Sequence, residues 1–164
     1  MNTKSIQLLL ADDDEDDCYF FKEALQGLPI TSMLTVVHDG EQLMELLHNK
    51  ASALPYILFL DLNMPRKGGH ECLMEIRLST RLRHLPVIIL STYISPETEE
   101  KLYKSGATHC IVKPTNIGQL KDVIQRELTL SGEADSLPTA NDDFLVKVVP
   151  AQKQRERKQE NTIR

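Results

Sequence analysis

Six consecutive acidic residues follow a short apolar run near the start of the chain. The stretch LLLADDDEDD covers residues 8–17, and its acids occupy positions 12–17. Two unit charges about 4 Å apart repel by roughly 4 kcal/mol at an effective dielectric of ~20, so such a run is unfavourable unless a cation offsets it. A hard divalent cation such as Mg²⁺, which prefers oxygen ligands, is the simplest candidate.

Three more residues able to do chemistry stand at the ends of other apolar runs. Asp61 ends YILFLD, Ser91 ends VIILS and Lys113 ends HCIVK. Taken alone, each has an ordinary alternative interpretation: a helix cap for Asp61, a loop residue for Ser91 and a solvated charge for Lys113. Their occurrence at corresponding positions of successive runs favours one shared site over three unrelated residues.

The elements that must position these residues alternate regularly. The predicted strands are apolar runs separated by amphipathic helical patterns, and they cover residues 5–11, 34–38, 56–61, 87–91 and 109–113. Continuous rather than alternating apolar runs indicate a sheet covered on both faces. Fivefold strand–helix alternation therefore predicts an α/β fold, a three-layer α/β/α sandwich with a five-stranded parallel sheet. Asp14 or Asp16, Ser95 and Asn116 are the predicted helix caps.

Such sheets place their sites at the carboxyl ends of the strands, where the singled-out side chains converge. The predicted ligands of Mg²⁺ are Asp12, Asp13, Asp61 and a backbone carbonyl near Asn63. A carboxylate such as Asp61 can attack a phosphoryl group, and the metal, Lys113 and Ser91 would stabilise the phosphoryl oxygens. The remaining acids, Glu15 to Asp17, are predicted to cap and solvate the first turn of a helix.

Composition narrows the functional class. The chain has 164 residues and a net charge of −5, which gives no general attraction to nucleic acid or anionic membrane. It contains no apolar run of about 18 residues and no signal-peptide pattern at its start. Its three cysteines are far apart and lack metal-type spacing, so reduced thiols in a cytoplasmic protein are expected and a zinc site is not.

The last part of the chain has a different character. We predict one domain over residues 1–130, followed over 131–164 by a polar linker and a charged tail. Within the tail, FLVKVV (144–149) is predicted to form a strand or to dock on a sheet edge, either its own or a partner's. Thirty-odd residues are too few for a DNA-binding output domain, and the charged end is interpreted as solvated.

Four quoted stretches together resemble one family. LLLADDDEDD, ILFLDLNMPRKGG, PVIILSTY and CIVKPTN are similar to the receiver domain of two-component response regulators, over roughly residues 5–129. The resemblance implies a flavodoxin-like strand order 2-1-3-4-5. It also implies a phosphohistidine on a sensor histidine kinase as the phosphoryl donor. PVIILSTY and the long first helix are similar to small stand-alone regulators that are partners of bacterial phytochromes.

The resemblance assigns roles residue by residue. Asp61 corresponds to the phosphoacceptor, Asp12 and Asp13 to the acidic pair that holds magnesium, and Asn63 to the residue that gives its backbone carbonyl. Ser91 corresponds to the switch hydroxyl and Lys113 to the phosphate-pairing lysine. Pro114 corresponds to the proline that follows through a cis bond, and Gly69 to the glycine that closes the loop.

The chain departs from the family pattern at two positions. Cys110 stands three residues before Lys113, where the family usually has a Tyr or Phe that turns inward on activation. Thr92 follows the switch hydroxyl, where Ala or Gly is usual. We therefore expect the switch to be transmitted through the loop that holds Tyr93 and through the surface of the last two helices, with self-association or kinase docking as the output.

The function predicted from the sequence is that of a single-domain response regulator, not an enzyme. An alternative is a Mg-dependent phosphatase with an aspartyl nucleophile, of the haloacid dehalogenase type. Such enzymes carry a general acid two residues after the nucleophile, and Asn63 cannot serve as one. A second alternative is a flavin-binding electron carrier of the same fold, but the acidic loop after the first strand would repel phosphate.

Overall fold

The computed structural model describes residues 4–132 and 145–146. Strands and helices alternate along the chain in the order β1 (Ile6–Ala11), α1 (Glu15–Gln26), β2 (Ser32–Val37), α2 (Gly40–His48), β3 (Ile57–Asp61), α3 (Gly69–Leu78), β4 (Val87–Ser91), α4 (Pro96–Lys104), β5 (His109–Val112), α5 (Ile117–Gly132) and β6 (Leu145–Val146). The described strands form one parallel sheet in the order β2-β1-β3-β4-β5-β6. The predicted order 2-1-3-4-5 of the first five strands is confirmed.

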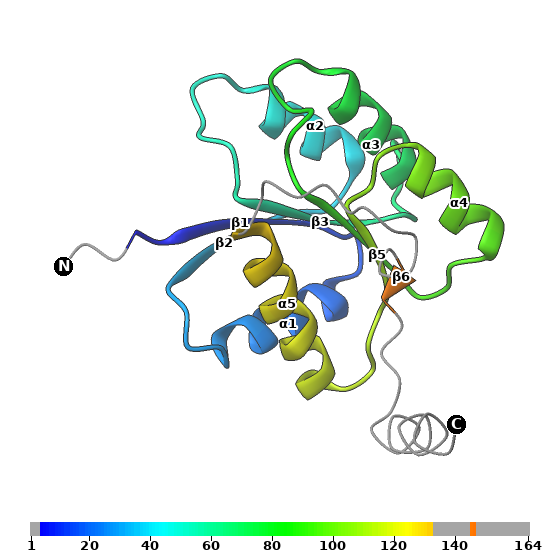
Figure 1. The fold of residues 1–164 in the computed structure, drawn as a ribbon. Helices are drawn as coiled ribbons and strands as arrows, with labels where there is room; N and C mark the ends of the chain where they lie inside the picture. The colour runs from blue at the N-terminus through cyan, green and yellow to red at the C-terminus, as the bar shows by residue number, and fades with distance from the viewer. Residues whose placement is uncertain (1–3, 133–144, 147–164) are drawn as a thin grey trace, which may run out of the picture.

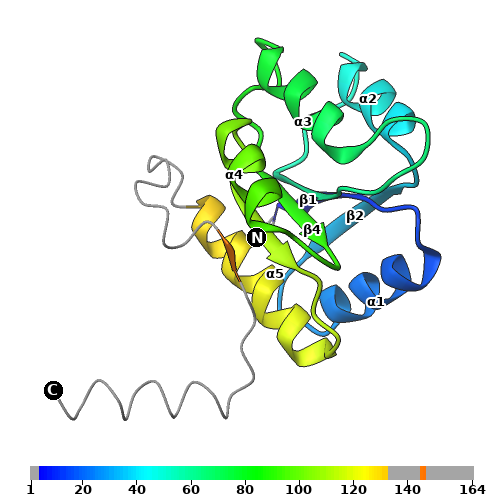
Figure 2. The same ribbon diagram turned by 90° about the vertical axis from the view of Figure 1, so that its right-hand side faces the viewer.

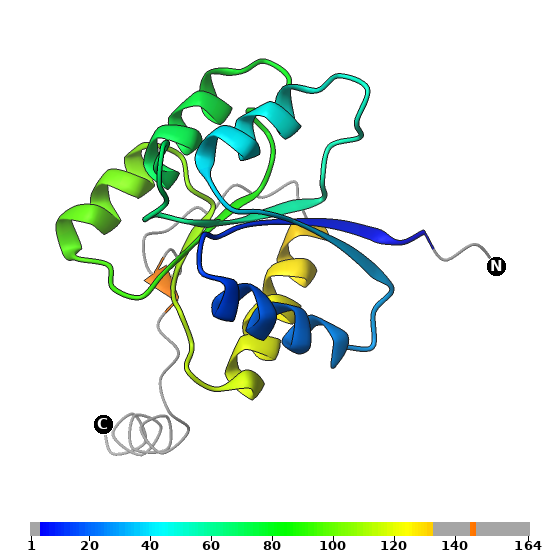
Figure 3. The ribbon, with the colours of Figure 1, turned by 180° about the vertical axis from the view of Figure 1, so that it is seen from behind.

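Helices cover both faces of this sheet, as Figures 1 and 3 show. Helices α1 and α5 lie side by side on one face, and α2, α3 and α4 lie on the other, as the turned view in Figure 2 confirms. Two hydrophobic clusters result, one on each face, and every residue of β3 and β4 is buried. The continuous apolar runs are explained by this arrangement, because alternate side chains of a central strand enter opposite clusters.

The helices begin where side-chain caps satisfy their first backbone N–H groups. The Asp14 carboxylate accepts from Asp17 N at 3.0 Å and starts α1. Ser95 caps α4, with Pro96 in the first turn, and Asn116 accepts from the N–H groups of Gly118 and Gln119 at the start of α5. The predicted caps Asp14, Ser95 and Asn116 are confirmed, since each supplies a side-chain oxygen at the right position.

A sixth strand extends the sheet beyond β5. Residues Leu145 and Val146 pair in parallel with Cys110 and Ile111 of the same chain. The predicted strand at 144–149 is therefore confirmed at these two positions, on the chain's own sheet edge. Its other positions, and most of the predicted linker and tail, lie outside the described residues.

Two local expectations are corrected. Strand β2 begins at Ser32, two residues before the predicted start, because half-buried and exposed residues alternate along most of this edge strand and the apolar signal is weak there. The structure has no cis peptide bond among its described residues, so the bond before Pro114 is trans. The two isomers of an X–Pro bond differ by only about 0.5–1 kcal/mol.

No helix in the described ranges is long and apolar enough to span a membrane.

Candidate functional site

Three carboxylates meet at the carboxyl edge of the sheet. Asp12 and Asp13 directly follow β1, and Asp61 is the last residue of β3. One oxygen from each lies within 4.8 Å of the others. Asp12 and Asp61 are buried, whereas Asp13 is exposed to solvent. The predicted acidic residues are therefore brought together, with one open side through which an ion or a phosphoryl group can approach.

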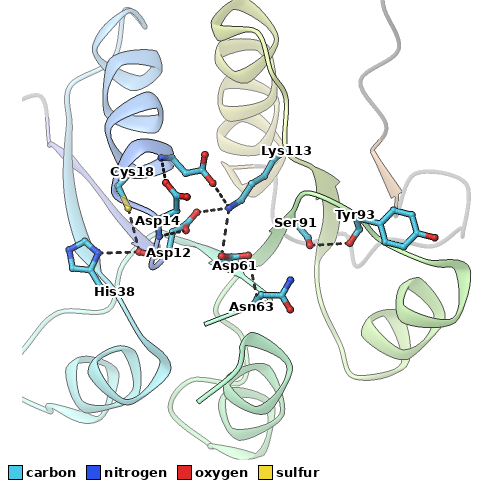
Figure 4. Close-up of polar contacts among 10 residues, drawn as sticks. Asp12, Asp14, Cys18, His38, Asp61, Asn63, Ser91, Tyr93 and Lys113 are labelled. Atoms are coloured by element: carbon cyan, nitrogen blue, oxygen red, sulfur yellow. Dashed lines mark hydrogen bonds and ion pairs between the residues drawn. The ribbon is translucent and has the colours of Figure 1, made fainter. Parts of the chain in front are cut away.

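Hydrogen bonds to its backbone and to its side chain fix Asp12. Its Oδ1 accepts from Asp14 N at 3.0 Å, and its own N–H donates to Val37 O at 3.1 Å. Its carbonyl oxygen accepts from the Cys18 thiol at 3.4 Å and from His38 Nδ1 at 3.1 Å, as Figure 4 shows. That carbonyl belongs to the peptide joining Asp12 to Asp13, so both donors orient the acidic pair. Sequence reasoning missed Cys18 and His38, since neither position has a pattern that reveals such a contact.

Lys113 follows β5 and lies among carboxylates from three segments. Its Nζ donates to Asp12 Oδ2 and to Asp17 Oδ2, each at 2.8 Å, and lies 3.6 Å from Asp61 Oδ2 (Figure 4). Burial disfavours the charge of Lys113, but the hydrogen bonds to Asp12 and Asp17 outweigh it and raise its pKa above the ordinary lysine value. The predicted role of Asp17, to solvate the first turn of α1, is therefore wrong in part. Asp17 reaches back from that turn to the buried lysine.

Asp61 is a carboxylate with altered acidity. Its side chain is only 9% exposed, and its Oδ1 accepts from Asn63 N at 3.4 Å. Burial raises the pKa of Asp61 to about 6, helped by the Asp12 charge and opposed by Lys113. A carboxylate of raised pKa is more basic, and hence more nucleophilic, than an ordinary one, yet it is still mostly ionised at pH 7. Asn63 lies beside Asp61, as Figure 4 shows.

Ser91 reaches the same edge but faces another partner. It ends β4, the strand next to β3, and is 1% exposed. Its hydroxyl donates to the carbonyl oxygen of Tyr93 at 3.0 Å (Figure 4), and the Tyr93 side chain is 75% exposed. The residue is thus at the predicted position, and its hydroxyl is held by the β4–α4 loop.

Cys110 is fully buried on the face covered by α2, α3 and α4. Burial raises the pKa of its thiol to about 12, so the side chain is a neutral, small apolar group. Cys110, which stands where the family usually has an aromatic residue, is therefore part of the core in this chain.

Gly69 is required by the packing of the loop after Asp61. A Cβ atom at this position would overlap the carbonyl oxygen of Asp61, and Gly69 N donates to Leu62 O at 2.9 Å. The close approach of α3 to the end of β3 is possible only for a residue without a side chain. The predicted loop-closing role of Gly69 is explained by this contact.

The donor set fits a hard divalent cation. It consists of carboxylate oxygens alone, two of them on buried side chains and one exposed. Mg²⁺ and Mn²⁺ prefer such oxygen ligands and retain water on their open sides. The residues present are therefore suited to a divalent metal at the rim of the site.

Comparison with known proteins agrees with this geometry. Residues 8–125 match the response regulator receiver domain family. Response regulator Rcp1 of Synechocystis sp. is 28% identical over 137 residues, which are 81% of this chain and 93% of Rcp1. The crystal structure of its Mn(2+)-bound form covers 82% of this chain and 99% of its own, with a TM-score of 0.70.

Two further solved structures are similar over most of the chain. The phosphorylated cyanobacterial phytochrome response regulator RcpA is 28% identical, with a TM-score of 0.71, and the match covers 83% of this chain and 100% of RcpA. Response regulator RPA3017, in red light signaling of R. palustris, is 31% identical with a TM-score of 0.71, and the coverage is 82% and 99%. With its fold and its acidic site, the chain therefore belongs to the response regulator receiver domain family of two-component signalling.

Proposed function

We propose that this protein accepts a phosphoryl group on Asp61 from a phosphohistidine of a sensor histidine kinase. The observation that carries the proposal is the constellation at the sheet edge. A buried carboxylate of raised pKa lies 3.6 Å from an ammonium group and within 4.8 Å of two further carboxylates. Phosphoryl transfer depends mainly on positioning and on charge stabilisation, and this constellation supplies both.

In the proposed step, an Asp61 carboxylate oxygen attacks phosphorus in line with the P–N bond of the donor. A P–O bond forms, the P–N bond breaks, and its electron pair returns to the imidazole nitrogen. The Lys113 ammonium balances the negative charge on the phosphoryl oxygens from one side. The product is an acyl phosphate on Asp61.

The proposed cofactor is Mg²⁺, held by Asp12, Asp13, Asp61 and the backbone carbonyl of Asn63. When bound, the ion would neutralise charge on the phosphoryl oxygens and on the acidic side chains. The oxygen-only donor set supports this assignment, and so does the manganese in the Rcp1 structure. The side chain of Asp13 is the solvent-exposed member of the set.

The proposed output is a change in protein–protein interaction, including formation of a homodimer. A phosphoryl oxygen on Asp61 would accept a charge-assisted hydrogen bond from Ser91, stronger than the bond that Ser91 now donates to the carbonyl of Tyr93. Release of that carbonyl would free the β4–α4 loop. Since Cys110 is small and buried, we propose that this loop transmits the change.

The proposed kinase partner is of the phytochrome type, because RcpA is a phytochrome response regulator and RPA3017 acts in red light signaling.

We propose further that residues 1–130 form the receiver domain of a cytoplasmic protein. Residues 131–164 are the polar linker and charged tail, and they contribute β6. The phosphatase alternative is less favoured, since residues 8–125 match the response regulator receiver domain and Asn63 cannot donate a proton to a leaving group.

The test is phosphorylation of the purified protein with a small phosphodonor in Mg²⁺. We expect one acid-labile phosphoryl group per chain, located on Asp61 by mass spectrometry and absent from Asp61→Asn. Undiminished phosphorylation of the variant, or no phosphorylation of the wild type by any donor, would contradict the proposal. Steady release of phosphate from small esters with many turnovers would favour the phosphatase instead.

A further inference from the structure

The Lys113 ammonium is held by two carboxylates that differ in their surroundings. Asp12, at 2.8 Å, is one of the three clustered acids, and its side chain is 3% exposed. Asp17, also at 2.8 Å, lies outside that cluster, and its side chain is 41% exposed. Of the two hydrogen-bond partners of Lys113, only Asp12 is therefore a candidate metal ligand.

A divalent cation at the cluster changes the balance between the two. Asp12 then shares its negative charge with the ion, which weakens its attraction for Lys113. The positive ion also repels the ammonium directly. Asp17 is not among the clustered acids, so its attraction for Lys113 remains.

The geometry of an ammonium group makes this remaining bond directional. Lys113 Nζ carries three hydrogens, two of which point to Asp12 and Asp17. The third is available for the side of Asp61, whose Oδ2 lies 3.6 Å from Nζ. An ammonium tethered at Asp17 can thus reach an oxygen attached to Asp61 without leaving its place.

The position of Asp17 in α1 makes the tether rigid. Asp14 caps the helix and accepts a hydrogen bond from the backbone N–H of Asp17, which fixes Asp17 as the third residue of the first turn. A side chain at this position points back past the start of the helix. Lys113 is thereby joined to α1 by a contact between residues 96 positions apart.

We propose that Asp17 is a positioning residue for phosphorylation, which holds Lys113 next to Asp61 once a metal ion engages Asp12. The inference rests on the proposed function and adds to it a residue outside the metal ligands and the phosphoacceptor. It also gives a specific task to one of the acids at the start of α1.

The neighbouring Asp16 provides a matched control. It lies in the same first turn, carries the same charge and is exposed. Loss of a negative charge near the site should, by itself, favour the approach of an anionic phosphodonor in both variants. General electrostatics therefore predicts equal or faster phosphorylation for Asp16→Ala and Asp17→Ala alike. The tether predicts slower phosphorylation for Asp17→Ala only.

The experiment compares both variants with the wild type at saturating Mg²⁺, with acetyl phosphate as donor. We expect Asp17→Ala to be phosphorylated about tenfold more slowly than Asp16→Ala, because small misplacements of a catalytic group reduce rates strongly. Asp17→Asn, which keeps the shape of the side chain, should fall between them. Equal rates for the two alanine variants, or a faster rate for Asp17→Ala, would overturn the proposal.

A second measurement does not depend on phosphorylation. Acetic anhydride labelling of Lys113, followed by mass spectrometry in Mg²⁺ without a phosphodonor, reports how firmly the amine is held. We expect several-fold more labelling in Asp17→Ala than in Asp16→Ala, with similar urea midpoints for both. Equal labelling would refute the tether even if Asp61 is phosphorylated. Failure of the wild type to be phosphorylated, with unequal labelling, would instead refute the proposed function.

Discussion

Replacement of Asp61 by Asn should stabilise the metal-free protein at neutral pH. Burial and the neighbouring Asp12 charge raise the pKa of Asp61 from 3.8 to about 6. The folded state therefore binds this proton more tightly than the unfolded state does. A difference of about two pKa units corresponds to about 3 kcal/mol at 1.36 kcal/mol per unit. Water and salt at the open side of the site reduce this, so we expect about 2 kcal/mol.

The sign of the effect follows from proton linkage. Well below pH 3.8, Asp61 is protonated in both states and its burial has no electrostatic cost. Between pH 3.8 and about 6 the unfolded state loses the proton while the folded state keeps it, so the wild type loses stability over this range, and the loss levels off once the folded state is ionised too. The Asn side chain is neutral at every pH. The stability gap between Asp61→Asn and wild type should therefore be small at pH 4, grow up to about pH 6 and level off at about 2 kcal/mol by pH 7.

The assay is urea unfolding in EDTA at half-unit steps from pH 4 to 7.5, with Asp16→Asn as a control for the loss of one exposed charge. Addition of Mg²⁺ at about 100 times its Kd should stabilise the wild type by about 2.7 kcal/mol and close the gap. Equal stability of Asp61→Asn and wild type at pH 7, or a gap that shrinks as the pH rises, would refute the reasoning.

Three further predictions concern the metal, the switch and the tail. Asp13→Ala should weaken Mg²⁺ binding, measured by calorimetry, and should make the metal-free protein more stable in urea, because one of three repelling charges is removed. Ser91→Ala should be phosphorylated yet show no phosphorylation-dependent dimerisation in light scattering, whereas Cys110→Ala should change that dimerisation by less than about tenfold, or about 1.4 kcal/mol. Truncation after Leu130 should leave cooperative unfolding and Asp61 phosphorylation intact, because the described part of β6 adds two residues to the outer edge of a sheet whose other five strands precede Leu130.

Much of the fold follows from patterns visible in the sequence. The continuous apolar runs of β3 and β4 predict a covered sheet, and their last residues, Asp61 and Ser91, mark its functional edge. The start of the edge strand β2 is predicted less accurately, because half-buried and exposed residues alternate along most of it and its apolar signal is weaker. The strand order came from the family resemblance, since parallel alternation alone is compatible with several orders.

Parts of the site could not be predicted because they depend on side chains that meet only after folding. The contact of His38 with the Asp12 carbonyl joins residues 26 apart, and that of Lys113 with Asp17 joins residues 96 apart. No local spacing encodes either contact. The sequence holds one indication for Asp17. It is the third residue after the predicted cap Asp14, and a side chain at that position of a helix points back toward the strand ends.

The six consecutive acids are compatible with a stable fold because their charges are distributed over several environments. Asp12 and Asp17 share the Lys113 ammonium, and Asp14 accepts the hydrogen bond that caps α1. Glu15 and Asp16 stand in the exposed first turn, where the helix dipole favours negative charge. Asp13 lies among the three clustered carboxylates, and no hydrogen bond or ion pair holds its side chain within the described part of the chain. Of the six acids, Asp13 is therefore the one whose charge most depends on a bound cation, and its removal should affect metal affinity more selectively than removal of Asp12, which would also loosen Lys113.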